Sequence, residues 1–161
     1  MAVTSDIMES WRRPRAVFRR HLARGRSEAF AFSLLCVFLL IALISRYPAA
    51  ARVSALDPKV PVPPQILGTA LGLLAAIPLL YTLAALSHLV ARTFGGRGGW
   101  YGARMALFWA LVTVTPFLLL SGIVAGLIGP GPQLWCAGGL TFAAFLFQWL
   151  TTLMVAETGM S

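Results

Sequence analysis

Acidic side chains are scarce in this sequence. Asp and Glu together number five among 161 residues, against thirteen Lys and Arg. All charged residues make up only 11% of the chain, whereas a soluble domain usually carries about a quarter. A water-facing surface cannot be covered at that density, so the composition excludes an ordinary soluble domain. With 58% hydrophobic residues and a mean hydropathy of +0.80, the chain is expected to be an integral membrane protein.

The groups that catalysis or metal binding requires are also few. Four of the carboxylates are scattered over both expected sides of the membrane, with no metal-ligand spacing and no nucleophile–base pair: Asp6, Glu9, Asp57 and Glu157. The two cysteines, Cys36 and Cys136, lie inside apolar runs without CxxC spacing and indicate packing positions. We therefore predict a protein that is not an enzyme, with no catalytic residues, no cofactor and no metal.

Four long apolar runs contain no Asp, Glu, Lys or Arg, and they cover residues 29–45, 66–91, 105–128 and 134–156. A helix needs roughly 20 apolar residues to cross the hydrocarbon core. The last three runs meet this length. The first has 17 residues and is expected to use Arg46 and Tyr47 as interfacial anchors. Arginines before it and Ala49-Ala50-Ala51 after it also fit a signal peptide, but the basic region is long, so an uncleaved first span is favoured.

The predicted fold class is all-α: a polytopic membrane helix bundle of four transmembrane helices with an N-terminal amphipathic interfacial arm. The arm covers residues 1–28, the transmembrane domain residues 29–156, and a C-terminal tail residues 157–161. Ten of the thirteen basic residues lie in the arm and in residues 92–104. The positive-inside rule then predicts that the N- and C-termini are both cytoplasmic. The basic surplus is expected to contact anionic lipid headgroups rather than nucleic acid.

Residues 5–24 alternate apolar and basic side chains at roughly helical spacing. Pro14 disfavours helix at the preceding residue, so two short helical pieces with a bend are expected. Such a segment is typical of a helix lying in the membrane interface. The alternative is a docking surface for a cytoplasmic partner. The residues assigned to this membrane-surface or partner arm are Trp11, Arg12, Arg13, Arg15, Phe18, Arg19 and Arg20. His21 is interpreted as another headgroup contact.

Two connections are rich in proline. Residues 46–65 contain Pro48, Pro58, Pro61, Pro63 and Pro64 and are expected to be extended and poorly helical. The short segment from Gly129 to Gln133 forces the last two spans into an antiparallel hairpin.

The stretch GGRGGWYGARMALFW, Gly95–Trp109, could be a phosphate-binding loop or a turn between spans. A nucleotide-binding loop needs a preceding strand and a GK[ST] ending, and this stretch has neither. A turn fits better, because glycines permit positive φ and aromatic side chains belong at the membrane interface. The residues assigned to this cytoplasmic turn are Gly95, Gly96, Arg97, Trp100, Tyr101, Gly102 and Arg104. Arg97 and Arg104 are expected to face headgroups.

A family resemblance becomes visible here. The glycine turn runs into Tyr101-Gly102 and then into a span with an internal Pro116. The chain also shares a proline before a short amphipathic piece, at residues 14–20, and the stretch 86–96 at the end of the second span. These features resemble the Yip-domain (Ypt/Rab-interacting) family of multi-spanning membrane proteins, in its bacterial branch. The resemblance implies structural roles for Gly102 and Pro116 and a membrane protein of poorly defined role.

The chain departs from that family in two ways. Members usually have five spans and four are counted here, so a fifth is either absent or supplied by another chain. The acidic N-terminal motif that accompanies small-GTPase binding is missing, so that activity is not transferred.

Within the predicted spans, His88 is the only ionisable side chain. It could serve a proton relay or ligand site, but a packing histidine bonded to a neighbour is favoured. No buried carboxylate is expected. Two GxxxG motifs, Gly68 with Gly72 and Gly122 with Gly126, predict close helix packing within the chain or with a partner helix. Pro78 and Pro116 are expected to kink their spans.

These features predict a non-catalytic scaffold, interaction or accessory subunit with a membrane-protein partner or homo-oligomer. The alternative is a small transporter or channel component whose bent second and third spans line a path past His88. A transporter should contain a polar cavity that reaches the membrane midplane, whereas a scaffold should be tightly packed.

Overall fold

The computed structural model describes residues 3–158, and this part of the chain folds into seven α-helices. The helices are α1 Val3–Arg12, α2 Pro14–Ala23, α3 Glu28–Leu56, α4 Val62–Thr93, α5 Trp100–Thr113, α6 Thr115–Leu127 and α7 Pro132–Glu157. Residues 1–2 of the predicted arm and residues 159–161 of the predicted tail lie outside the described residues.

Three of these helices, α3, α4 and α7, are long and apolar enough to cross a membrane. A fourth span results if α5 and α6 count as one, although they meet at a 44° bend. The break falls at Val114, just before Pro116, whose ring cannot fit into a continuing helix. The predicted kink in this span is therefore confirmed, and it is a true interruption. Pro78, by contrast, lies inside the uninterrupted α4.

The prediction of an extended connection over residues 46–65 is wrong. Helix α3 continues through Pro48 to Leu56, so that only residues 57–61 separate it from α4. Pro48 is followed by Ala49, Ala50 and Ala51, and alanine has the strongest helix propensity of all residues. Prolines are also tolerated within membrane helices where neighbouring helices support the backbone. The clustered prolines from Pro58 onward do mark the connection.

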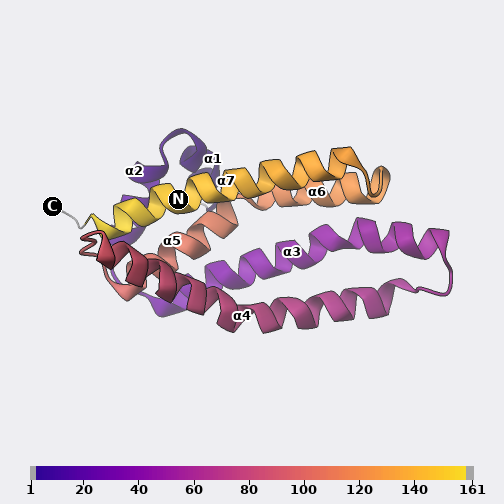
Figure 1. The fold of residues 1–161 in the computed structure, drawn as a ribbon, viewed down its shortest axis with the longest axis horizontal. Coiled ribbons are helices and arrows are strands. Elements are labelled where there is room, and N and C mark those ends of the chain that lie inside the picture. The colour runs from indigo at the N-terminus through magenta and orange to yellow at the C-terminus, as the bar shows by residue number, and fades with distance from the viewer. Residues whose placement is uncertain (1–2, 159–161) are drawn as a thin grey trace.

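Two helical hairpins, α3–α4 and α6–α7, run toward the end of the bundle opposite the C-terminus (Figure 1). The turn between α6 and α7 contains Gly129 at φ +89°, a left-handed conformation that glycine adopts readily. Gly122 and Gly126 bring α6 close to α3, because a Cβ on either glycine would collide with the α3 backbone or side chain at Ser45 or Pro48. This second GxxxG motif thus packs within the chain.

Helix α5 forms the centre of the bundle and is covered by α3, α4, α7 and the two N-terminal helices. Between Tyr101 and Thr115 every residue except Arg104 is buried. The largest completely inaccessible side chains among them are Trp109, Phe108, Met105 and Leu107. The interior around α5 is therefore occupied mainly by buried apolar side chains.

The N-terminal segment forms two helices with a break at Arg13, as Pro14 predicts. Its apolar side is turned toward the protein: Val17 and Phe18 are buried in the same core as α5, and the ring of Trp11 lies 5.1 Å from that of Phe117. Figure 1 places α1 and α2 beside α5 and α7, near the end of the bundle that carries the C-terminus. The apolar face predicted to lie in lipid is used here for packing against helices.

Candidate functional site

The glycine-rich segment between α4 and α5 is a structured turn. Gly95 has φ +88°, and the Gly96 N–H donates to the carbonyl of Ala91 at 2.9 Å, so the pair closes the C-terminus of α4 in the way that glycine commonly does. The Arg97 N–H donates to the carbonyl of Glu157 at 2.8 Å. The turn is therefore fixed to the last residue of α7, which lies far away in the sequence.

Beneath this turn lies a buried acid–base pair. His88 Nδ1 and Glu157 Oε1 are 2.6 Å apart, with the two residues only 2% and 6% exposed. The second carboxylate oxygen accepts a hydrogen bond from the Gly98 N–H at 3.1 Å. The ring of Trp100 lies 4.6 Å from the imidazole and covers it. Glu157 thus links α4, α7 and the turn through hydrogen bonds. These hydrogen bonds are stronger than they would be in water, because the pair is buried.

Two glycines make this close approach possible. A Cβ on Gly98 would lie 2.8 Å from Glu157 Oε2 and would collide with the carbonyl oxygen of Ala156. A Cβ on Gly96 would lie 2.7 Å from the same carboxylate oxygen. The glycines are therefore required by the contact between the turn and the end of α7.

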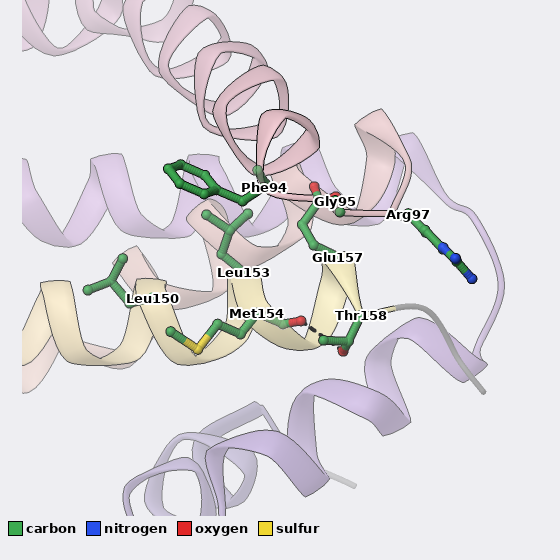
Figure 2. A pocket seen from close by; sticks show the side chains of 10 residues that line it. Phe94, Gly95, Arg97, Leu150, Leu153, Met154, Glu157 and Thr158 are labelled. Atoms are coloured by element: carbon green, nitrogen blue, oxygen red, sulfur yellow. Dashed lines mark hydrogen bonds between the residues drawn. The ribbon is translucent and has the colours of Figure 1, made fainter.

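A hollow of about 630 Å³ lies beside this centre, between the ends of α4 and α7. Its walls are mainly apolar, from Phe94, Leu150, Leu153 and Met154, and Glu157 lines its inner end. Figure 2 shows the Phe94 ring above Leu153 and the Arg97 side chain extending away from the hollow. Within residues 3–158, no three His, Cys, Asp or Glu side chains are grouped to hold a metal ion.

A second polar cluster anchors the N-terminal helices. Arg20 binds Glu9 at 2.7 and 3.1 Å and Asp6 at 3.1 Å. The hydrogen bonds from Arg20 lower the pKa of the Glu9 carboxyl below its ordinary value, and the same contacts raise the pKa of the guanidinium. This arginine therefore links α1 to α2 through its ion pairs with Asp6 and Glu9.

Ser10 connects the arm to the helix bundle through hydrogen bonds. Its hydroxyl accepts a hydrogen bond from Trp109 Nε1 at 3.2 Å, and its carbonyl accepts one from Gln148 Nε2 at 3.2 Å. All three residues are completely buried. The arm is thus held by specific polar contacts to α5 and α7 as well as by apolar packing.

His21 is buried between the rings of Trp109 and Phe30, with its Nε2 atom 3.5 Å from a carboxylate oxygen of Asp6. Neither ring nitrogen makes a hydrogen bond. Burial, followed by the nearby charge of Arg24, lowers the pKa of His21, and the Asp6 carboxylate opposes this shift. The interpretation of His21 as a headgroup contact is therefore wrong.

Several other predicted positions also differ. Trp100, Tyr101, Gly102 and Arg104 belong to the first turns of α5 and not to the loop. Tyr101 is buried, with its hydroxyl 3.5 Å from the Ser27 carbonyl, and Arg104 pairs with Glu28 instead of facing headgroups.

The expectation that no carboxylate is buried is wrong twice, for Asp6 and for Glu157. The predicted C-terminal tail over residues 157–161 includes Glu157, but this residue is the last residue of α7. Its closeness to the end of an apolar run is the only signal that could have suggested a role. His88 is the histidine bonded to a neighbour that the sequence favoured.

The first GxxxG motif, unlike Gly122 and Gly126, does not pack against another helix within residues 3–158. Gly68 and Gly72 lie on an open face of α4, where an added Cβ would meet nothing within 4 Å. Arg12, Arg13, Arg15 and Arg19 are exposed.

This architecture defines a class: a multi-pass α-helical membrane protein with three or four membrane-length helices. The family model for the Yip1 domain matches residues 8–161, almost the whole chain, so the protein belongs to the Yip1-domain family. No curated protein and no solved structure gives a match.

Proposed function

We propose that this Yip1-domain protein is a non-catalytic scaffold or accessory subunit of a bacterial cytoplasmic membrane. The observation that carries the proposal is the filled interior around α5, where bulky apolar side chains such as Trp109 and Phe108 occupy the centre of the bundle. A protein whose interior is closed acts through its surfaces, and these surfaces would meet lipid and partner helices.

Helix α4 offers the surface for a partner helix. Its most apolar 18-residue window contains no buried residue, although the helix is 32 residues long. Gly68 and Gly72 lie one turn apart on this face and leave the backbone accessible. Small residues at this spacing let a second helix approach closely, and van der Waals packing then stabilises the pair. The expected partner is a membrane protein or a second copy of the chain.

The proposed orientation places both termini in the cytoplasm. It is supported by the position of the basic segments, because the arm and the glycine-rich turn occupy the same end of the bundle. Tyr101 reaches the Ser27 carbonyl there, Arg104 pairs with Glu28, and the turn is bonded to the end of α7. Basic residues concentrated at one end indicate the cytoplasmic side. The transporter alternative is not favoured, since His88 is enclosed by Glu157 and Trp100.

The test is co-purification from gently solubilised membranes through a C-terminal tag, followed by mass spectrometry. The wild type should retain a stoichiometric membrane partner or a second copy. The double variant Gly68→Leu/Gly72→Leu should lose it while remaining folded, because neither position has a neighbour to displace.

The matched control is Gly138→Leu/Gly139→Leu on α7, where both glycines are equally open. It should keep the partner. A monodisperse wild-type monomer, or equal loss in both double variants, would count against the proposal.

A further inference from the structure

The junction of α1, α2 and α7 holds a hollow of about 440 Å³ whose rim is strongly basic. Arg12 and Arg13 come from the bend between the two short helices, and Arg15 and Arg19 lie one turn apart on α2. All four are exposed. The hollow therefore brings together four positive charges from two different helices.

Within residues 3–158, no carboxylate forms an ion pair with any of these four arginines. Of the five carboxylates, Asp6 and Glu9 bind Arg20, Glu28 binds Arg104, and Glu157 binds His88. Asp57 lies in the α3–α4 connection at the far end of the bundle, where it accepts a hydrogen bond from the Lys59 N–H.

Glu9 is close enough to Arg13 for that charge to help lower its pKa, but both of its oxygens are held by Arg20. Across residues 3–158, the four guanidinium groups have no ion-pair or hydrogen-bond partner. The four exposed guanidinium groups are therefore free to bind an anionic group of another molecule.

The remaining wall of the hollow indicates which molecule it is. It is formed by Phe147 and Thr151 of α7, a membrane-length helix, and Phe147 is 55% exposed. The Thr151 hydroxyl bonds back to the carbonyl of Phe147, so it does not add a polar group to the rim. A soluble anion would gain nothing from the exposed aromatic ring. A phospholipid would place its phosphate among the arginines and its acyl chain along Phe147.

We propose that the hollow formed by Arg12, Arg13, Arg15, Arg19 and Phe147 is a binding site for the headgroup of an anionic phospholipid. Guanidinium groups form charge-assisted, often bidentate hydrogen bonds with phosphate. The break at Pro14 turns the chain so that arginines from both helices face one hollow. The inference rests on the membrane setting of the proposed function and is independent of its scaffold role.

The test uses the full chain in detergent and native mass spectrometry with added dioleoyl phosphatidylglycerol or dioleoyl phosphatidylcholine. These two lipids share their acyl chains and differ in headgroup charge. The wild type should retain phosphatidylglycerol in preference. Each arginine near an anionic surface adds roughly fivefold to binding, so the four together could add several hundredfold. The variant Arg12→Gln/Arg13→Gln/Arg15→Gln/Arg19→Gln should weaken phosphatidylglycerol binding at least about tenfold, even if only two of the four contribute fully.

The matched control removes four other exposed arginines, in the variant Arg24→Gln/Arg26→Gln/Arg92→Gln/Arg97→Gln, and loses the same net charge. Its affinity should stay within about threefold of the wild type. An equal loss in both quadruple variants would assign binding to diffuse charge and overturn the site. Equal retention of the two lipids by the wild type would also overturn it.

A third variant, Phe147→Ser, keeps every charge but removes part of the apolar wall. It should weaken phosphatidylglycerol about fivefold, because the half-exposed ring would be covered by the acyl chain. An unchanged affinity in Phe147→Ser, or displacement of the lipid by millimolar glycerol phosphate, would identify a soluble phosphate as the ligand and refute a lipid site. Failure of this experiment leaves the partner experiment on α4 unaffected.

Discussion

The buried pair of His88 and Glu157 should contribute strongly to the stability of the bundle. Its geometry resembles that of the Arg104–Glu28 pair: the closest atoms are 2.6 Å apart in the first and 2.5 Å apart in the second. The difference is burial. The side chains of His88 and Glu157 are 3% and 6% exposed, whereas those of Arg104 and Glu28 are 28% and 59% exposed. The two pairs thus differ in exposure and also in the donor, which is an imidazole in the buried pair and a guanidinium in the exposed pair.

Truncating one partner of a buried pair leaves the other without its hydrogen bond. His88→Ala is expected to cost about 3 kcal/mol, at the lower end of the cost of breaking a buried pair. Glu157→Ala should cost at least as much, because the Gly98 N–H also loses its acceptor. A double-mutant cycle should then give a coupling energy of about 2 kcal/mol. The exposed Arg104–Glu28 pair should give less than about 1 kcal/mol.

The assay is unfolding of the purified protein in mixed micelles, followed by tryptophan fluorescence and reported as the free energy of unfolding. Trp100, which covers the imidazole, provides a local signal. A coupling energy for His88 and Glu157 that is no larger than that of Arg104 and Glu28 would refute the reasoning, since the buried hydrogen bond would then be absent in the folded protein.

Two further predictions concern packing and protonation. Gly122→Ala should lower the free energy of unfolding by about 1–3 kcal/mol, because the new Cβ would collide with the Ser45 carbonyl of α3. Gly68→Ala, on an open helix face, should instead raise it by roughly 0.5–1 kcal/mol, and destabilisation at both positions would contradict the packing described. Burial lowers the pKa of His21, so the unfolded chain binds more protons once the pH falls below about 6.5, and thermal stability should decrease there. His21→Gln should flatten this decrease between about pH 7.5 and pH 5, and an unchanged pH profile would exclude His21 as its source.

The sequence predicts the local features of this fold well. Apolar runs locate the membrane-length helices, Pro14 and Pro116 locate two helix breaks, and the glycine-rich stretch after Phe94 marks a turn. Each of these signals depends on residues close together in the chain. The wrong prediction of an extended segment at Pro48 has the same origin. It depends on the proline alone, whereas the alanines that follow Pro48 and the packing of α6 against it favour a continuous helix.

The polar centres could not be predicted in this way. His88 and Glu157 are separated by 69 positions, and Ser10 reaches Gln148 across 138. No period or motif links such residues, and an acidic residue near the chain end resembles an ordinary exposed tail. The amphipathic pattern of the basic arm predicts a helix with one apolar side, but it does not show whether lipid or protein covers that side.

The central position of α5 constrains the order in which the protein can fold. The hydroxyl of Ser10 binds Trp109 and its carbonyl binds Gln148, so α1 depends for its final position on α7, which is synthesised later. During synthesis the arm must therefore wait until α7 has been inserted, and contacts between such distant segments form slowly. Docking of the arm is then the closing step of assembly, and until it occurs the side of α5 that carries Trp109 is uncovered. A chain that is truncated before α7 would lack the Gln148 contact to Ser10 and the helix that packs against α5.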